Sequence, residues 1–285
     1  MLDAYSGDRM AIGEAWAADT AALARYVRGD ELHQVFNFQW LNAPWSASAW
    51  RQVVEDTFAA TGPVGATPTW VLSNHDVVRT PSRYGEGPQG LARARAALLA
   101  MLALPGSAYL FQGEELGLPQ VDVPPDRRQD PSYLRGRGTG RDGCRVPLPW
   151  TADGPDTSYG FSPAGAAPAW LPQPPGWGDL SVQAQAGRPG STLELVRAAL
   201  ALRRRLVPGL GDEVAVPADL PDGAFVVRRA GLDGPGLSSV VACGSAPVEL
   251  ASVGLAGAEP LLVSAPGAVA DGVLHADCAA WFATP

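Results

Sequence analysis

The sequence predicts an α/β fold made of parallel β/α units, followed by a small antiparallel β domain. Short apolar runs alternate with helical patterns over residues 9–111, and short β-type runs separated by turns fill residues 207–285. Strands and helices that alternate with short connections form right-handed parallel units. The first part is therefore either a doubly wound sheet or a barrel.

The elements of the first part follow one another in a regular order. Strands are expected at residues 9–13, 34–38, 69–73 and 107–111, and helices at residues 20–27, 47–60 and 91–104. The helix over residues 91–104 has the strongest pattern, because Leu91, Leu98 and Met101 repeat at helical spacing and Pro105 stops it.

The second part changes character. Residues 112–190 are rich in Gly, Pro, Asp and Arg without a sustained period, which predicts a long ordered loop region that carries function. An amphipathic helix is expected next, at residues 193–206. Five β-type runs follow, at residues 225–228, 239–243, 247–250, 261–264 and 280–282. We therefore expect a first domain over residues 1–206, with the insertion at 112–190, and an all-β domain over residues 207–285.

Composition excludes several classes of function. The 285 residues are 46% hydrophobic, carry a net charge of −8 and contain no lysine, so nucleic acid is not expected as a partner. No run approaches the ~20 apolar residues of a membrane span, and residues 1–15 lack the features of a signal peptide. This predicts a cytoplasmic protein, provided that Met1 is the true start.

The cysteines indicate neither a disulfide framework nor a metal site. Cys144, Cys243 and Cys278 are odd in number and widely spaced, so each is expected to be a small buried residue. No cofactor and no metal are expected for this chain.

Two carboxylates are the main functional candidates. Glu14 and Asp76 each close a short apolar run that is typical of a buried strand. Strand ends are where β/α barrels hold their catalytic residues, and paired carboxylates are the groups that cleave glycosidic bonds.

Four segments, taken in order, resemble one family. They are Ile12-Gly-Glu-Ala-Trp16, Leu72-Ser-Asn-His-Asp76, Phe111-Gln-Gly-Glu-Glu-Leu-Gly117 and Arg141-Asp-Gly-Cys-Arg-Val-Pro-Leu-Pro-Trp150. Together they resemble segments of the α-amylase superfamily, glycoside hydrolase family 13, in its α-glucosidase and oligo-1,6-glucosidase branch. The resemblance covers about residues 1 to 205.

The resemblance implies a fold and a set of roles. It implies the C-terminal half of a (β/α)8 TIM barrel, strands five to eight, followed by a small antiparallel β-sandwich. Glu14 would be the general acid/base and Asp76 the stabiliser of the transition state. Asn74, His75 and Arg145 would bind the substrate, with Arg145 at the terminal glucose.

The same resemblance exposes a missing group. The family's nucleophile is an aspartate in a segment like Gly-Phe-Arg-x-Asp on the fourth strand, and no such segment occurs here. Asp3 and Asp8 fit a turn and a solvated surface instead. The expected activity is that of a retaining α-glucosidase acting on oligosaccharides. The chain alone is expected to be inactive, with exposed strand edges that make it aggregated, oligomeric or poorly ordered.

Simpler roles remain open for most of these residues. Arg141 and Arg145 could pair with Asp130 or Asp142 in a solvated loop, and Arg79 and Arg83 have the same alternative. Asn74 could serve a turn or a helix cap. The resemblance gives Glu114 and Glu115 no chemical role. Four tryptophans could stack on sugar faces or belong to the core, namely Trp16, Trp150, Trp170 and Trp177.

Two other functions remain open as well. One is a glucosyl-transferring or trehalose-forming member of the family, and the other is a non-catalytic protein that binds sugar. Linkage preference, oligomeric state and any metal site in the half that would precede Met1 are not determined by the sequence.

Overall fold

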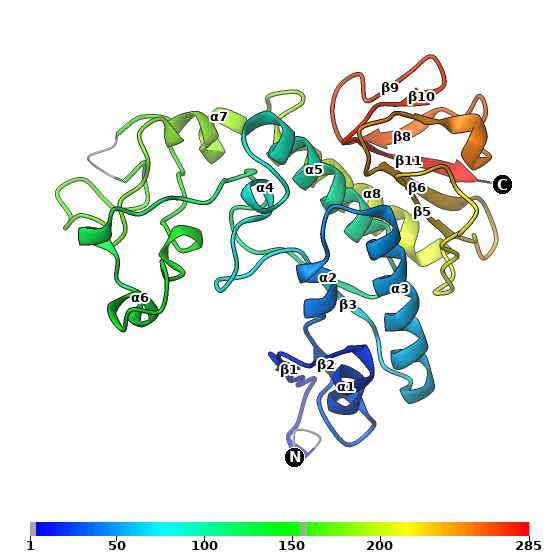
Figure 1. Cartoon of the computed structure of the whole chain (residues 1–285), viewed down its shortest axis with the longest axis horizontal. Helices are drawn as coiled ribbons and strands as arrows, with labels where there is room; N and C mark the ends of the chain where they lie inside the picture. Colours follow the sequence, from blue (N-terminus) through cyan, green and yellow to red (C-terminus); the bar gives the residue numbers. More distant parts are fainter. Residues whose placement is uncertain (1–3, 155–157, 285) are drawn as a thin grey trace. The chain divides into compact units, whose positions relative to one another are not determined.

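The computed structural model describes residues 4–154 and 158–284, which form two compact units (Figure 1). Unit 1 comprises residues up to Leu72, Ala96–Tyr109 and residues from Arg203 onward, and unit 2 comprises Ser73–Arg95 and Leu110–Leu202. None of the helices in the described ranges is long and apolar enough to cross a membrane. Of the residues named above, Asp3 lies outside the described residues.

Parallel strand pairs organise the first part of unit 1. Strand β1 pairs in parallel with β2, and β3 pairs in parallel with β4. The predicted parallel character is therefore confirmed. The bounds of the strands and of the helices between them are β1 Ile12–Gly13, α1 Thr20–Ala24, β2 Gln34–Val35, α2 Phe38–Asn42, α3 Ala47–Thr61, β3 Thr69–Val71 and β4 Ser107–Tyr109.

Helix α5 (Gly87–Ala103) leads into β4 through a turn that only glycine fits. Gly106 has φ +99, and a Cβ on it would lie 2.3 Å from the carbonyl oxygen of Pro68. The last carbonyls of this segment are bound by Arg203, whose guanidinium donates to Leu102, Leu104 and Gly106. A cation is favourable at a helix C-terminus, so Arg203 joins α8 (Thr192–Leu206) to the end of α5.

The C-terminal part of unit 1 consists of two antiparallel sheets. The larger has the order β5-β6-β11-β8 and the smaller the order β7-β10-β9. Both sheets contribute to one apolar cluster, which includes Val226, Val240 and Leu274. The predicted antiparallel β region is confirmed. Its strands are β5 Ala224–Arg229, β6 Gly236–Ala242, β7 Val248–Glu249, β8 Pro260–Val263, β9 Val269–Ala270, β10 Val273–Leu274 and β11 Ala279–Thr284.

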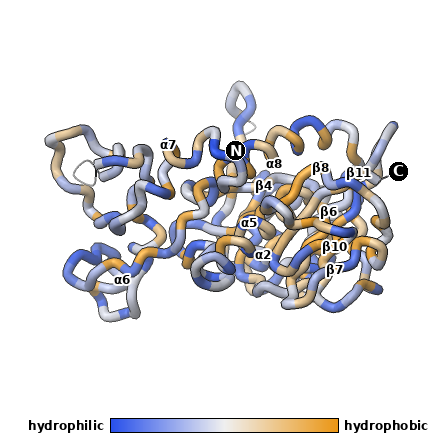
Figure 2. The backbone as a smooth tube through the Cα atoms, turned by 90° about the horizontal axis from the view of Figure 1, so that it is seen from above, coloured by the Kyte–Doolittle hydropathy of each residue, from blue (hydrophilic) through white to orange (hydrophobic). Residues whose placement is uncertain are grey.

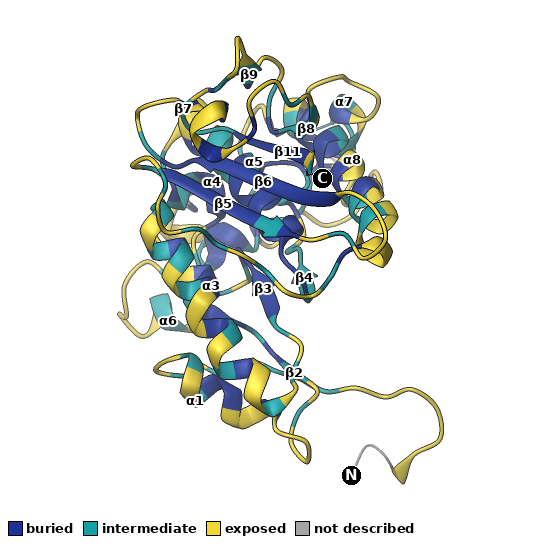
Figure 3. Cartoon of the chain, turned by 90° about the vertical axis from the view of Figure 1, so that its right-hand side faces the viewer, coloured by how far each residue is buried: buried dark blue, intermediate teal, exposed yellow. Residues whose placement is uncertain are grey.

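Strands β5, β6 and β11 are buried along most of their length, as Figure 3 shows. On β11, Ala280 and Phe282 join the cluster between the sheets. Trp281 lies between them in sequence and so faces the other way, where its indole N–H donates to the Leu99 carbonyl of α5. Both faces of the larger sheet are therefore packed, which explains the continuous apolar runs.

Unit 2 contains little regular structure. Besides parts of α5 and α8, its α-helices are α4 Thr80–Arg83, α6 Pro131–Leu134 and α7 Val182–Gln185. A small apolar cluster, with Leu116, Val146 and Trp177 among its members, forms its core. The segment around α6 is largely hydrophilic (Figure 2). The predicted long ordered loop region is present, although short helices interrupt it.

Some boundaries differ from the prediction. Residues 36–38 were expected to extend a strand, but β2 ends at Val35 and Phe38 begins α2, because the Asn37 side chain caps that helix through the Trp40 N–H. Strands β9 and β10, and helices α2 and α4, were not predicted, since each is too short to show a period. The domain boundary at residue 206 stays a prediction.

Candidate active site

Glu14 directly follows β1 in unit 1 and is exposed. Strand β1 lies close to β2 because residue 13 is glycine: a Cβ there would lie 2.5 Å from Leu32 Cδ1 and 3.3 Å from Val35 Cγ2. Trp16, two residues on, is 57% exposed and packs its ring at 4.3 Å from that of Phe38. The structure thus places Glu14 at a strand end, as predicted, with its carboxylate open to solvent. The expectation that this strand is buried is wrong, because Ile12 is 39% exposed.

Asp76 stands in unit 2 at the end of the segment that follows β3. The side chain of Asn74 accepts a hydrogen bond from the Asp76 N–H at 2.8 Å, which closes a tight turn. The turn role considered for Asn74 is therefore observed, whereas substrate binding by Asn74 stays a prediction. His75 is half exposed, with its Nε2 at 3.4 Å from Asp76 Oδ1.

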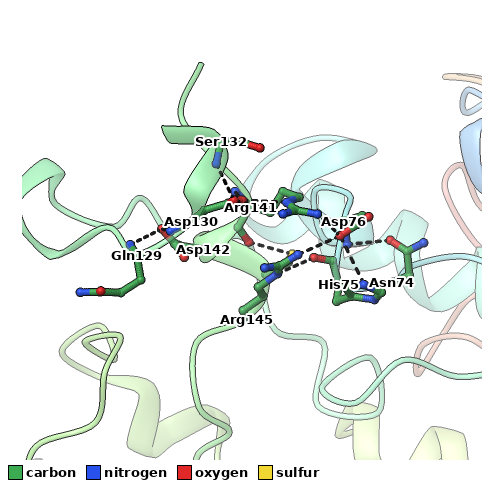
Figure 4. A network of polar contacts seen from close by, with 10 residues as sticks. Asn74, His75, Asp76, Gln129, Asp130, Ser132, Arg141, Asp142 and Arg145 are labelled. Carbon is green, nitrogen blue, oxygen red and sulfur yellow. Dashed lines mark hydrogen bonds and ion pairs between the residues drawn. The ribbon is translucent and has the colours of Figure 1, made fainter. Parts of the chain in front are cut away.

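Two arginines hold the Asp76 carboxylate (Figure 4). Arg145 Nη2 and Arg141 Nη1 each lie 2.8 Å from Asp76 Oδ1. Arg145 also donates from Nε to the carbonyl of His75. Arg145 therefore does not pair with Asp130 or Asp142, and the alternative of a solvated loop pair is wrong for this residue. Charge-assisted hydrogen bonds of this kind are short and fix the orientation of the carboxylate.

Arg141 makes a second ion pair, with Asp130. Its Nε and backbone N–H both donate to Asp130 Oδ2 at 2.7 Å, and Nη2 donates to Oδ1 at 3.1 Å. The loop pairing considered for Arg141 is therefore present, and it coexists with the contact to Asp76. The hydrogen bonds from Arg141 hold the pKa of the Asp130 carboxyl well below its usual range, and they raise that of Arg141.

Asp142 stabilises the loop through its backbone contacts. Its Oδ2 accepts from the N–H groups of Gln129 and Asp130, at 2.8 and 3.0 Å. Asp142 is 4% exposed and makes no ion pair with Arg141 or Arg145 among the described residues. The carboxylates of Asp130 and Asp142 thus replace the hydrogen bonds that a strand or helix would supply to this segment.

A second polar group in unit 2 surrounds Arg79. This residue is 2% exposed and donates to the carbonyls of Gln112 and Cys144. Glu114 accepts from the Phe111 N–H and the Thr80 hydroxyl, and desolvation raises the pKa of Glu114 to about 7. These groups organise the turn after residue 111. Arg83 lies with its guanidinium carbon 4.6 Å from the Tyr84 ring centroid, and Glu115 accepts from the Gly113 N–H.

None of the three cysteines, all of which lie in the described ranges, forms a disulfide. Cys144 and Cys243 are buried as predicted, and burial raises the pKa of the Cys144 thiol. Cys278 is only partly buried, so the expectation of a buried residue is wrong for it. Within either unit, the described residues hold no group of three His, Cys or acidic side chains placed to bind one metal ion.

The predicted aromatic platforms differ in exposure. Trp150 and Trp170 are 50% and 82% exposed, so their rings are open to a ligand. Trp177 is 4% exposed and belongs to the core of unit 2, in agreement with the core alternative considered for it. It also lines a pocket of about 610 Å³ together with Pro124, Pro174 and other residues, but neither Asp76 nor Arg145 belongs to that pocket.

A family comparison decides the identity of the chain. Residues 1–209 match the model of the alpha-amylase catalytic domain. The chain belongs to the α-amylase family, glycoside hydrolase family 13. Asp8 is exposed, in agreement with the solvated surface role expected for it.

Relatives of this α-amylase-family chain include an alpha-glucosidase and a trehalose synthase/amylase. It is 36% identical over 184 residues to a probable alpha-glucosidase of Rhizobium meliloti, covering 62% of this chain and 31% of the relative. It is 30% identical over 213 residues to the trehalose synthase/amylase TreS of Mycobacterium tuberculosis, covering 62% of this chain and 33% of the relative.

A solved structure of an alpha-glucosyl transfer enzyme, XgtA, matches the whole α-amylase-family chain. The TM-score is 0.81 at 30% identity, and the match covers 100% of this chain and 52% of the other. The chain thus spans about a third of the length of its curated relatives and about half of this structure. The fold is that of α-amylase-family enzymes. Whether it is strands five to eight of a barrel stays a prediction.

Proposed function

We propose that this chain carries the acid/base and the transition-state stabiliser of a retaining α-glucosidase that releases terminal α-linked glucose from oligosaccharides. The observation that carries the proposal is the fixed Asp76 carboxylate, held by Arg141 and Arg145 at the end of the segment after β3. The alpha-glucosidase among its relatives supports the substrate class.

The proposed roles follow from the chemistry of glycoside cleavage. Glu14 protonates the leaving oxygen and later removes a proton from the attacking water. Asp76 stays ionised, favours the oxocarbenium-like transition state and binds sugar hydroxyls with His75. Arg145 donates to the terminal glucose, because a guanidinium presents fixed donors.

The nucleophile of this mechanism lies about 5 to 5.5 Å from the acid in retaining enzymes. The 285 residues contain no Gly-Phe-Arg-x-Asp segment to supply it. Turnover therefore requires a further polypeptide segment, and the chain by itself binds sugar without cleaving it.

The first experiment measures hydrolysis of 4-nitrophenyl α-glucoside and calorimetric binding of maltose by the 285-residue chain. We expect no turnover and saturable binding that Asp76→Asn and Arg145→Lys weaken. A soluble monomer that hydrolyses the aryl glucoside at ordinary rates would overturn the assignment of the missing nucleophile.

In the second experiment, the part of the alpha-glucosyl transfer enzyme that precedes the matched region is fused to the N-terminus of this chain. We expect glucosidase activity that Glu14→Gln and Asp76→Asn abolish. Leu232→Ala serves as the control, since this exposed residue belongs to none of the candidate site segments. A correctly folded fusion that binds maltose but stays inactive supports a non-catalytic sugar-binding protein instead.

A glucosyl-transferring function is the second candidate, because a trehalose synthase and a glucosyl transfer enzyme are among the relatives. Both functions use the same acid and stabiliser and differ in the acceptor. Product analysis of the fusion with and without added glucose separates them: disaccharide as the main product favours transfer, and free glucose favours hydrolysis.

A further inference from the structure

Arg141 joins two carboxylates that differ in their surroundings. The side chain of Asp130 is fully buried, whereas that of Asp76 is 21% exposed. Asp130 accepts hydrogen bonds from the Ser132 N–H and from three donors of Arg141. Asp76 receives only one bond from Arg141. Asp130 is therefore the anchor of this arginine.

The anchor fixes the orientation of the guanidinium. Nε and Nη2 of Arg141 both bind Asp130, one to each oxygen, which sets the plane of the group. Asp130 is itself held through its N–H to Asp142 Oδ2. Nη1 is then the remaining nitrogen of the fork, and it lies 2.8 Å from Asp76 Oδ1. The buried carboxylate of Asp130 thus decides the direction in which Arg141 Nη1 donates.

The contacts of Asp76 are concentrated on one oxygen. Oδ1 accepts from Arg141 and Arg145 and lies 3.4 Å from His75 Nε2. Within the described part of the chain, Oδ2 accepts no hydrogen bond. The carboxylate is thus fixed through Oδ1 and leaves Oδ2 to a ligand. Figure 4 shows the resulting chain of groups from Asp130 through Arg141 to Asp76.

We propose that Arg141 is a positioning residue, which transmits the fixed geometry of Asp130 to Asp76 and so sets the carboxylate for sugar binding. The inference rests on the proposed function only in the claim that Asp76 binds sugar. The bridge itself is a separate claim about how the segment after β3 is held.

Lysine cannot replace Arg141 in this role. A lysine keeps the positive charge, but it presents a single nitrogen and no planar fork, so it cannot bind both oxygens of Asp130 and reach Asp76 together. Arg141→Lys therefore removes the bridge while the charge near Asp76 stays the same. Asp130→Asn tests the other end, since it keeps the size of the anchor and removes its charge.

The binding test uses calorimetry on the full chain with the cationic sugar analogue 1-deoxynojirimycin. We expect Arg141→Lys and Asp130→Asn each to weaken binding about tenfold, and the double variant to be no weaker than either, because both break one bridge. In an Asp76→Asn background, Arg141→Lys should have no further effect. Equal weakening in both backgrounds would contradict the proposal.

The matched control is Arg128→Lys. Arg128 lies in the same loop, donates to the Val123 carbonyl and pairs with the exposed Asp122. In the described part of the chain it makes no hydrogen bond or ion pair with Asp76 or Asp130. We expect this variant to bind the analogue like the unaltered chain. If it weakens binding as much as Arg141→Lys does, general loosening of the loop explains the effect and the proposal fails.

A second measurement does not depend on sugar binding. Amide hydrogen exchange should rise at residues 74–78 in Arg141→Lys, in addition to residues 129–145, and should not rise at residues 74–78 in Arg128→Lys. Unchanged exchange at residues 74–78 in Arg141→Lys would overturn the bridge. If the unaltered chain fails to bind the analogue, the proposed function fails, and the exchange result alone decides the role of Arg141.

Discussion

Different kinds of interaction stabilise the interiors of the two units. Unit 1 packs aromatic rings against one another. The centroid of the Trp40 ring lies 5.3 Å from that of Trp50, 5.4 Å from that of Trp70 and 6.4 Å from that of Phe225. Unit 2 relies on buried polar groups, such as Asp130 and Arg79. Burial of apolar area is non-directional, whereas a buried hydrogen bond requires one geometry.

The difference follows from the backbone of each unit. Strands and helices satisfy most backbone groups of unit 1 within the elements themselves. The loops of unit 2 lack that pairing, so side chains replace it. Gln185, for example, donates to the Leu116 and Leu180 carbonyls and accepts from the Leu193 N–H. The unit that carries Asp76 is therefore expected to respond more strongly to pH than the aromatic unit.

The largest expected effect lies in the aromatic core of unit 1. Trp40→Ala removes a side chain that is 1% exposed and leaves a cavity among Trp50, Trp70 and Phe225, so we expect the free energy of unfolding to fall by about 3–5 kcal/mol. Urea denaturation measures it. The exposed Trp170→Ala in unit 2 is the control and should change stability by less than about 0.5 kcal/mol. Similar losses of stability in both variants would contradict the proposed difference between the two units.

The next effect tests the polar anchor of unit 2. Asp130→Ala leaves the Ser132 and Arg141 donors without their carboxylate, and we expect a loss of about 2–3 kcal/mol in urea denaturation. Asp122→Ala removes a carboxylate that is 96% exposed and pairs with Arg128, and it should have almost no effect.

Acid should remove the contribution of Asp130. The pKa of Asp130 is lower in the folded chain than in the unfolded chain, so its stabilisation is present above the ordinary aspartate range and is lost as pH falls through the folded value. The stability difference between the unaltered chain and Asp130→Ala should therefore shrink in acid. A difference that stays constant on acidification speaks against the ion pair with Arg141.

Glu114 should give unit 2 a dependence on pH of the opposite sign. Its pKa is raised from 4.5 to about 7 in the folded chain, so the folded state keeps a proton that the unfolded state releases. Stability then falls as pH rises through this window, by about 1–3 kcal/mol. Glu114→Gln cannot titrate, so it should gain that amount relative to the unaltered chain between pH 5 and pH 8. A constant difference over this range contradicts the raised pKa.

The smallest expected effect concerns helix caps, where the two units should agree. Asp19 caps α1 in unit 1 through the Ala22 N–H at 2.7 Å, and Ser181 caps α7 in unit 2 through the Ala184 N–H at 3.1 Å. Substitution of either by alanine should cost about 1 kcal/mol. Markedly different costs for the two caps, measured by thermal unfolding, would show that the units also differ in their local interactions.

Sequence patterns located most elements of unit 1 because those elements bury apolar side chains at regular spacing. Helix α3 and strand β11 are examples, predicted at residues 47–60 and 280–282 and observed at Ala47–Thr61 and Ala279–Thr284. Helix α2 was missed because its start is set by the side chain of Asn37, which also donates to Thr57 twenty residues later. Such a contact has no local pattern.

The candidate site likewise has residues that the sequence named and contacts that it did not predict. Motifs that resemble family segments named Asp76 and Arg145 as candidates, and the structure brings these two side chains together. The bridge from Asp130 through Arg141 was considered only as a loop pair, since nothing in the spacing of residues 76, 130 and 141 says that they meet. A glycine or aspartate signals that a loop turns there, but it does not determine which distant carboxylate the loop will contact.

The sequence by itself determined the family, the alternation of strands and helices and the antiparallel C-terminal strands, because each of these is encoded by local order or by the period of apolar residues. The tertiary structure decided which charges pair. Arg145 pairs with Asp76 rather than with its neighbour Asp142, and Arg141 pairs with two carboxylates at once. The physical reason is that an ion pair depends on distance in space, which chain segments far apart in sequence acquire only when the loops of unit 2 fold.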